Sequence, residues 1–198
     1  MRPDLDVVAA MVPAGSRVLD LGCGDGGLLE HLIRSLDCDG RGVEISREGF
    51  HACVRRGVPV IEANIDQGLP DFDDGAFDLV ILSQTLQATR RPRLVLQEMM
   101  RVAGAAIVSF PNFGHWAVRA GLAVHGRMPE SRALPYSWDE TPNIHLCTIR
   151  DFERLVQGES MRVAQRIWLG GNGQRARSSV QRRPNLLAAG AVYRLTRD

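Results

Sequence analysis

Residues 17–27, with the sequence Arg-Val-Leu-Asp-Leu-Gly-Cys-Gly-Asp-Gly-Gly, decide the fold of this chain. Their first half, from Val18 to Leu21, is a short and mostly apolar run of the kind that forms a buried parallel strand. The glycines at 22, 24, 26 and 27 then allow a tight turn, and they let a ligand approach the backbone closely. Leucines and an isoleucine recur at helical spacing from Leu28 to Leu36, which predicts a helix directly after the turn.

A second strand with an acidic end follows this helix. It covers residues 42–45, and Glu44 lies twenty residues after Gly24. Strand, glycine turn, helix, strand and acidic end together are typical of a nucleoside-binding βαβ unit, in which the acidic side chain accepts hydrogen bonds from ribose hydroxyls. We therefore expect Glu44 to bind a ribose.

The glycines alone do not identify the ligand. Positions 22, 24 and 27 fit the dinucleotide pattern G-x-G-x-x-G, and positions 22, 24 and 26 fit G-x-G-x-G equally well. Asp20 separates the two, because a dinucleotide places its anionic pyrophosphate at the helix N-terminus, where a carboxylate would repel it. S-adenosylmethionine carries an ammonium and a sulfonium group instead. The segment 20–26, D-L-G-C-G-D-G, resembles the first motif of the class I methyltransferases, which implies S-adenosylmethionine or its demethylated product, S-adenosylhomocysteine, as the ligand.

The chain continues with alternating elements. Strands are predicted at residues 58–61, 79–82 and 105–110, so five strands alternate with helices in a doubly wound parallel sheet. Residues 161–169 and 188–196 add two strands, and a short helix over residues 4–12 is expected to cover the sheet edge near the ligand. With the methyltransferase resemblance, the predicted fold is α/β and Rossmann-like: a class I methyltransferase fold whose doubly wound, mostly parallel seven-stranded sheet carries helices on both faces.

Further ligand contacts are implied by the same resemblance. In class I methyltransferases the end of the third strand offers a polar side chain and a backbone amide to the adenine, and Asn64 and Ile65 hold those positions here. Residues 69–81, L-P-x-F-x-D-G-x-F-D-L-V-I, resemble the fourth-strand motif, and Ser83 follows at the strand tip, where ligands of open α/β sheets bind. No catalytic residue is identified. The expected cofactor-binding residues are Asp20, Gly22, Cys23, Gly24, Glu44, Ile45, Asn64, Ile65 and Ser83.

Composition limits the other function classes. The 198 residues, 44% of them hydrophobic, fit one domain over residues 1–198 with a substantial core. A net charge of +1 argues against nucleic acid or a membrane surface as partner. No apolar run approaches a membrane span and no signal peptide is evident, so a cytoplasmic protein is expected. The four cysteines form no C-x-x-C pair and the histidines are dispersed, so reduced thiols and no metal site are expected.

Two segments of the last third are irregular. The glycine- and arginine-rich residues 170–183 are expected to form a mobile loop. Residues 111–146 form a long polar and aromatic insert, expected to be a lid over or beside the ligand cleft because it follows the fifth strand. Its rings and basic groups either line a substrate pocket or pack a lid or an interface, and spacing does not decide between these; they are His115, Trp116, Arg127, Tyr136, Trp138 and His145. Trp116, Arg127, Met128, Arg132, Tyr136 and Trp138 also match the composition of protein interfaces.

Motifs in the second half resemble the MetW family of methionine biosynthesis proteins. They are L-S-Q-T-L-Q (82–87), E-M-M-R-V (98–102), S-F-P-N-F-G-H-W (109–116), G-R-M-P (126–129) and T-P-N-I-H-L-C-T-I (141–149). The likeness runs from about residue 2 to just beyond residue 152, and general methyltransferases lack the later motifs. It implies a methyltransferase-like fold, a role in methionine synthesis and association with homoserine O-acyltransferase (MetX). The tail beyond about residue 158 matches weakly, and residues 137–140 differ from the expected W-Y-D.

Three functions follow from these patterns. The first is a partner or activator of homoserine O-acyltransferase that binds S-adenosylmethionine or S-adenosylhomocysteine. The second is an active methyltransferase on a small metabolite. The third, a nicotinamide oxidoreductase, is disfavoured by Asp20 and by the fourth-strand motif. The specific sequence of the insert favours the first.

Overall fold

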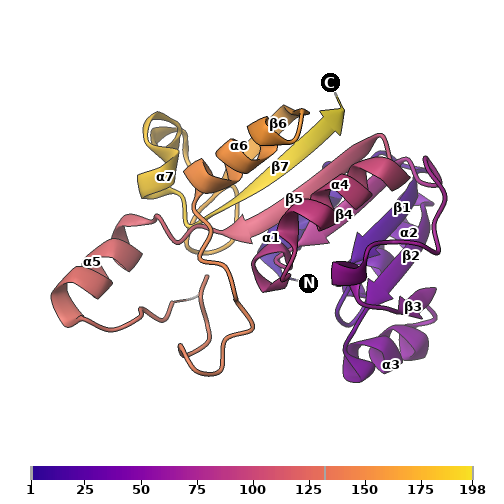
Figure 1. Ribbon diagram of the computed structural model, residues 1–198, viewed down its shortest axis with the longest axis horizontal. Helices are drawn as coiled ribbons and strands as arrows, with labels where there is room; N and C mark the ends of the chain where they lie inside the picture. Colours follow the sequence, from indigo (N-terminus) through magenta and orange to yellow (C-terminus); the bar gives the residue numbers. More distant parts are fainter. Residues whose placement is uncertain (1, 132, 198) are drawn as a thin grey trace.

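Seven strands form one sheet at the centre of the computed structural model, which describes residues 2–131 and 133–197 (Figure 1). The strand order is β3-β2-β1-β4-β5-β7-β6. The pairs from β3 to β5 are parallel, whereas β7 runs antiparallel to both β5 and β6. This confirms the predicted doubly wound, mostly parallel sheet. The strands are β1 Arg17–Leu21, β2 Asp39–Glu44, β3 Val60–Glu62, β4 Leu79–Ser83, β5 Ala105–Pro111, β6 Met161–Leu169 and β7 Gly190–Arg197.

Helices cover both faces of the sheet. On one face, Met99 of α4 and Phe152 of α6 pack in the larger part of the core. On the other face, Val8 of α1 and Leu32 of α2 do the same. Within the described ranges, no helix is both long and apolar enough to cross a membrane. The helices are α1 Pro3–Ala9, α2 Gly27–Leu36, α3 Arg47–Arg56, η1 Ile65–Gln67, η2 Leu86–Ala88, α4 Pro92–Val102, α5 Trp116–His125, α6 Ile149–Gly158, η3 Ser178–Arg182 and α7 Pro184–Leu187, where η denotes a 3-10 helix.

Side-chain caps and a glycine set the ends of α3 and α6. Ser46 precedes α3, and its side chain accepts a hydrogen bond from the Gly49 N–H at 3.4 Å. Gly57 ends the helix with a φ of +72°, a conformation that favours glycine. Thr148 and Asp151 form a capping box at the start of α6, since each side chain accepts from the backbone N–H of the other.

The helix α1 is shorter than predicted. It ends at Ala9 instead of residue 12, and single turns carry the chain on to Val12. It packs on a sheet face, where Val8 joins Val18 of β1 and Ile81 of β4 in the core, and its cover of the sheet edge near the ligand stays a prediction. Val8 and Ala9 are buried there, so this face covers the apolar side of the short helix.

The insert lies beyond the C-terminal ends of the parallel strands, at the lower left of Figure 1. Its helix α5 stands apart from the sheet in that view and has no buried residue. The backbone N–H groups of Ile144 and His145 donate to the Gln87 carbonyl oxygen at 2.8 and 3.0 Å. These bonds hold the far part of the insert beside the tip of β4.

Residues 170–183 contain regular structure that the sequence did not predict. The Ala176 N–H donates to the Trp168 carbonyl at 2.7 Å, and η3 follows. A Cβ at Gly173, where φ is +78°, would lie 3.5 Å from atoms of Pro3 and Asp4. The turn at Gly173 therefore packs against the start of α1, and the mobility of the segment stays a prediction.

Candidate functional site

Three of the four glycines after β1 adopt the left-handed conformation. The φ angle is +71° at Gly22, +58° at Gly24 and +76° at Gly26, whereas Gly27 is the first residue of α2. A Cβ at Gly22 would lie 2.7 Å from the Thr85 side chain, but a Cβ at Gly24 would meet nothing within 4 Å. The turn therefore uses the G-x-G-x-G pattern, and its middle glycine borders open space that a ligand can enter.

A cavity of about 580 Å³, the first cavity, lies beside this turn. Its volume is typical of small-molecule sites, which span about 300–1,000 Å³. The N-terminal residues, the glycine turn, α2 and the tip of β4 all contribute to its wall. The lining residues are Arg2, Leu5, Asp20, Gly22, Cys23, Gly24, Asp25, Gly27, Leu28, Glu30, Arg56, Ser83, Gln84 and Thr85.

Asp20 is a buried carboxyl group in the wall of the first cavity, with 3% of its surface exposed. Burial, and after it the negative charge of Glu44, raises the pKa of Asp20 to about 7, while Arg2 acts in the opposite direction. A buried carboxylate without a strong partner is unfavourable. A cationic ligand in this cavity would therefore be attracted to Asp20 and would favour its ionised form.

Asp25 places its carboxylate at the N-terminus of α2. Its Oδ1 accepts from the Gly27 N–H at 3.1 Å, at the start of α2, and its Oδ2 pairs with Arg56 at 2.6 Å. Arg56 also pairs with Glu30 at 2.9 Å. A ligand phosphate would compete with a carboxylate for this helix N-terminus, so the geometry disfavours a nicotinamide dinucleotide.

Glu44 is buried, and backbone N–H groups bind its carboxylate. Oε2 accepts from Gly24 N at 2.8 Å, and Oε1 accepts from Ile45 N at 3.0 Å and Ser46 N at 2.8 Å. A Cβ at Gly49 would lie 2.9 Å from Glu44 Cγ, so α3 packs directly against this side chain. The three bonds use three of about four acceptor positions of a carboxylate. Glu44 therefore ties the glycine turn to the end of β2, and its contact with a ribose remains a prediction.

The other predicted residues are distributed unevenly around the first cavity. Ser83 lines it, and its Oγ lies 2.9 Å from the Oγ of Ser109. Ile45 is 62% exposed, and Asn64 Oδ1 accepts from the backbone N–H two residues later at 3.0 Å. Ile65 packs against the core. Ile45, Asn64 and Ile65 are not among the residues that line the cavity, so their contacts with an adenine stay predictions.

Cys23 fills space inside the turn. A Cβ at Gly42 would lie 2.5 Å from its sulfur, and its sulfur lies 3.7 Å from that of Cys53. Burial raises the pKa of the Cys23 thiol, which keeps it protonated and unreactive. The four cysteines of the chain are free thiols.

Nine of the fourteen residues that line the cavity were not among the predicted ligand contacts, and Arg2, Gln84 and Thr85 are three of them. Arg2 lies just before α1, and Gln84 and Thr85 follow β4. Gln84 has a φ of +56°, which is uncommon for a residue other than glycine. Residues in such backbone conformations cluster at functional sites. The sequence signal for Gln84 and Thr85 was that they follow the end of a predicted strand. No sequence pattern marks Arg2.

A second cavity of about 610 Å³ shares Arg2 and Gln84 with the first. The insert, the turn at residues 169–173 and the tips of β4 and β5 contribute to its wall. Of the six residues considered for a substrate pocket (His115, Trp116, Arg127, Tyr136, Trp138 and His145), Tyr136 is the one found in this wall. The structure therefore does not bring the six together. Arg132 lies outside the described residues.

We expect protein purified without added metal to contain far less than one zinc ion per chain. Within residues 2–131 and 133–197, no three His, Cys, Asp or Glu side chains are placed to hold a metal ion. A tetrahedral zinc site needs three or four such ligands. Elemental analysis checks the metal content, and stoichiometric zinc that is lost in His145→Ala would contradict the expectation.

Comparison with known proteins places this geometry in a family. A family model described as methionine biosynthesis protein MetW matches residues 2–195. The bifunctional methionine biosynthesis protein MetXA/MetW of Rhodopirellula baltica is 37% identical over 205 residues, which cover 98% of this chain and 33% of that protein. The chain spans about a third of the length of the curated relatives that it matches.

Solved structures share the whole fold at low sequence identity. An S-adenosylmethionine-dependent methyltransferase from Mesorhizobium loti superposes with a TM-score of 0.70 and 16% identity, over 97% of this chain and 96% of that one. One from Archaeoglobus fulgidus gives a TM-score of 0.68 and 14% identity, over 98% and 94%. These likenesses confirm the class I methyltransferase fold. With that fold, and with a family match over nearly its whole length, the chain belongs to the MetW family of methionine biosynthesis proteins.

Proposed function

We propose that the first cavity binds S-adenosylmethionine or S-adenosylhomocysteine. The buried Asp20 carboxyl, the open space at Gly24 and the cavity volume support this, because they suit a small cationic ligand held against a backbone turn. Asp20 would attract the positive charge, and the glycine turn would contact the ligand through its backbone. When bound, S-adenosylmethionine supplies an activated methyl group. Glu44 would use its remaining acceptor position for a ribose hydroxyl.

The affinity for S-adenosylmethionine is expected to fall as the pH is lowered. Because the pKa of Asp20 is raised to about 7, this carboxyl loses its charge over the range from pH 7.5 to 6.0. If the cation binds the ionised form, the dissociation constant should rise roughly eightfold over that range. Calorimetric titrations at several pH values measure this.

Asp20→Asn is the matched variant for the pH experiment. It keeps the shape of the side chain but cannot titrate, so its dissociation constant should be high and nearly independent of pH. The same slope in wild type and variant would assign the pH dependence to another group. No binding by the wild type, or tighter binding of NAD than of either adenosyl compound, would reject the proposed cofactor.

The proposed biological role is that of a partner that supports homoserine O-acyltransferase. The observation that carries it is the relative from Rhodopirellula baltica, whose name joins MetXA and MetW and of which this chain matches only 33%. A polypeptide that joins MetXA and MetW holds the two close together. Separate MetX and MetW chains are therefore candidates for a complex. The exposed apolar surface of the insert supports the same proposal.

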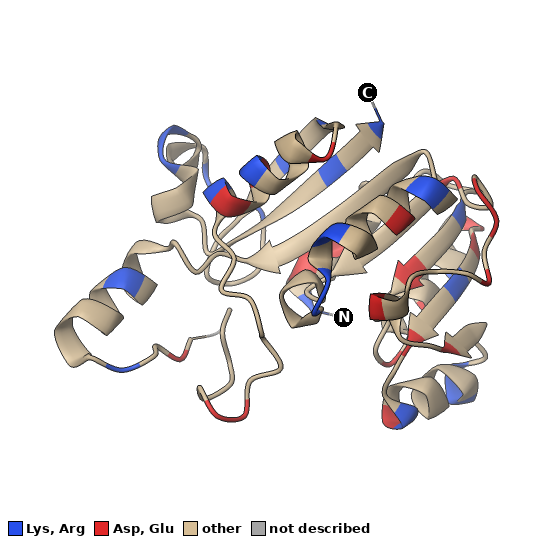
Figure 2. Ribbon diagram, viewed as in Figure 1, with Lys and Arg blue, Asp and Glu red and all other residues tan. Residues whose placement is uncertain are grey.

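That surface is unusually rich in apolar groups for solvent contact. Eight of the eleven large hydrophobic residues that are exposed in the described structure lie in the insert. Figure 2 shows few charged residues on α5. Exposed apolar patches of this kind mark interaction sites. The eight are Trp116, Leu122, Val124, Met128, Tyr136, Trp138, Ile144 and Leu146.

Co-purification tests the partnership directly. A tagged copy of this chain is expected to retain homoserine O-acyltransferase from the same organism, and the acyltransferase activity should be higher with this chain than without it. Separate elution of the two proteins, together with unchanged activity, would reject the proposal.

A second candidate function is methyl transfer to a small metabolite. The second cavity favours it, because it adjoins the first and shares Arg2 and Gln84 with it. Formation of S-adenosylhomocysteine that depends on an added small acceptor would support this function. Positioning of the acceptor beside the methyl group accounts for much of such catalysis, so a strong general base is not required.

A further inference from the structure

Gln84 links the first cavity to the segment that follows β4. It lines both cavities, and its φ is +56°. Its N–H donates to the Ser109 carbonyl at 2.9 Å, so β5 fixes that side of the residue. Its carbonyl oxygen accepts from Nε2 of Gln87 at 2.9 Å. A ligand that displaces Gln84 therefore acts on its bond with Gln87.

Gln87 joins this bond to the insert. It is a buried residue of η2, and its backbone oxygen accepts from the N–H groups of Ile144 and His145. Apart from bonds to the directly adjoining chain, in the helical ladder of α5 and from the Cys147 N–H to the His145 carbonyl, these two are the hydrogen bonds that connect the described part of residues 120–146 with the rest of the molecule. One residue therefore contacts the cavity wall through its side chain and the insert through its backbone.

The side chain of Gln87 is also incompletely satisfied. Its bond to Gln84 fixes the orientation of the amide, and Oε1 is buried with no hydrogen-bond partner among the described residues. An unpaired buried acceptor raises the free energy of the arrangement that contains it. An arrangement that satisfies Oε1 would recover this free energy, and ligand binding at Gln84 is placed to favour one arrangement over the other.

The geometry points to Gln87 as the positioning residue that couples occupancy of the first cavity to the placement of the insert and thereby to partner binding. This inference rests on the proposed function. Coupling between two sites is reciprocal, so a ligand that favours the partner-binding arrangement is bound more tightly, by the same factor, when the partner is present. Gln87 contacts neither the partner nor the ligand in this scheme, and it acts through Gln84 and through the insert.

Hydrogen exchange with S-adenosylhomocysteine as the probe tests the coupling. In the wild type, saturating S-adenosylhomocysteine is expected to slow exchange of the Ile144 and His145 amides several-fold. Gln87→Met keeps the backbone oxygen that binds these amides but removes the side-chain bond to Gln84. In this variant the ligand effect on the two amides should disappear, while the calorimetric affinity for S-adenosylhomocysteine stays within a few-fold of wild type.

Gln165→Met is the matched control, because Gln165 is exposed on β6, away from both cavities. It should retain the full ligand effect. Binding of S-adenosylhomocysteine without any change at Ile144 and His145, or an undiminished change in Gln87→Met, would overturn the coupling while leaving the proposed cofactor intact. Absence of binding would instead reject the cofactor itself.

A measurement on the wild type alone covers the case in which Gln87→Met does not fold. The dissociation constant of S-adenosylhomocysteine is measured with and without saturating homoserine O-acyltransferase. It is expected to differ several-fold between the two conditions. Equal constants, in a mixture shown to contain the complex, would overturn the coupling.

Discussion

Replacement of Glu44 with alanine is expected to lower the free energy of unfolding by about 2–4 kcal/mol, because hydrogen bonds to a charged group contribute about 1.5–3 kcal/mol each and water recovers part of the loss. The carboxylate accepts from the N–H groups of Gly24, Ile45 and Ser46. Without it, the glycine turn is no longer tied to the end of β2. Urea-induced unfolding followed by circular dichroism measures the difference.

The same variant is expected to bind S-adenosylhomocysteine at least tenfold more weakly, both through a lost ribose contact and through a displaced glycine turn. Glu62→Ala is the matched control. Glu62 pairs in register with Glu44 on the neighbouring strand, but it is exposed, and its ion pair with Arg47 is 3.7 Å long. Its removal should change stability by less than about 1 kcal/mol. Equal stability of the two variants would show that the backbone bonds of Glu44 contribute little.

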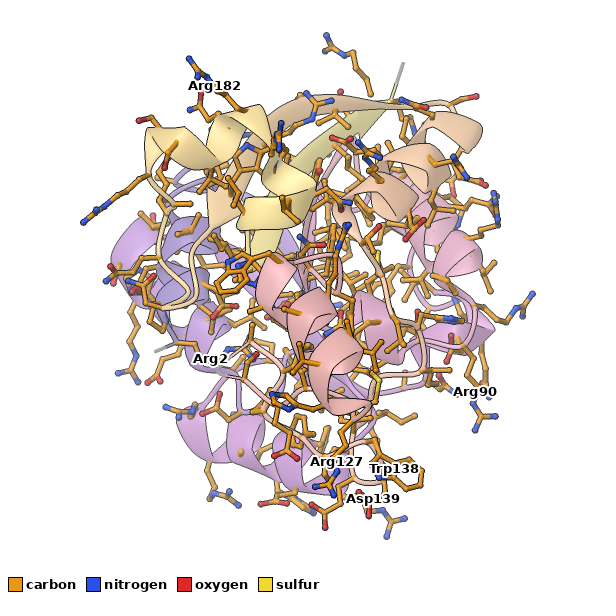
Figure 3. All side chains as sticks on the ribbon, turned by 90° about the vertical axis from the view of Figure 1, so that its left-hand side faces the viewer. Arg2, Arg90, Arg127, Trp138, Asp139 and Arg182 are labelled. Carbon is orange, nitrogen blue, oxygen red and sulfur yellow. The ribbon has the colours of Figure 1, made fainter. Side chains whose placement is uncertain are left out.

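Trp138→Ala and Arg127→Ala are each expected to weaken the complex with homoserine O-acyltransferase by about 30-fold, which corresponds to roughly 2 kcal/mol, if these residues are interface hot spots. Trp138 is 75% exposed, and both side chains lie together at the lower end of the molecule in Figure 3, below α5. Tryptophan and arginine are the residue types that most often dominate binding energies. Affinity measured by surface plasmon resonance checks the effect.

Two control variants accompany this experiment. Arg182 lies at the opposite end of the molecule in Figure 3, and Val54 is 54% exposed on α3. Arg182→Ala and Val54→Ala should leave the affinity for the acyltransferase unchanged. Retention of full affinity by both insert variants would move the contact to another surface. Loss of adenosyl-ligand binding in the insert variants would show that they perturb the cofactor site instead.

The βαβ unit could be predicted because its signals are local, and the same signals carry the proposal of the ligand class. An apolar run, closely spaced glycines and a helical period lie within 20 consecutive residues, 17–36. The carboxyl group of Asp20 favours a cationic ligand over an anionic one, and its residue type can be read from the sequence alone. Its burial and its raised pKa, in contrast, depend on the residues that cover it.

The segments after β5 were less predictable for the same physical reason. The insert has a composition that suits either a pocket or an interface, and only packing determines whether its rings face a cavity or solvent. The structure leaves Trp138 exposed and places Tyr136 in the wall of the second cavity. The turn at Gly173 was predicted as an irregular mobile loop, because its contact with Pro3 joins opposite ends of the chain.

By itself, the sequence determined the fold class and the glycine turn and identified Asp20 and Glu44 as candidate ligand-binding residues, since periodicity, conformational freedom and ionisable groups belong to single residues or to neighbours along the chain. Tertiary structure decided which glycines adopt the left-handed conformation. Gly22, Gly24 and Gly26 do, whereas Gly27 is the first residue of α2. Tertiary structure also decided that Glu44 binds the backbone of Gly24 and that Gln87 binds the insert. Those contacts join residues far apart along the chain, and only the packing of the sheet and its helices brings them within hydrogen-bonding distance.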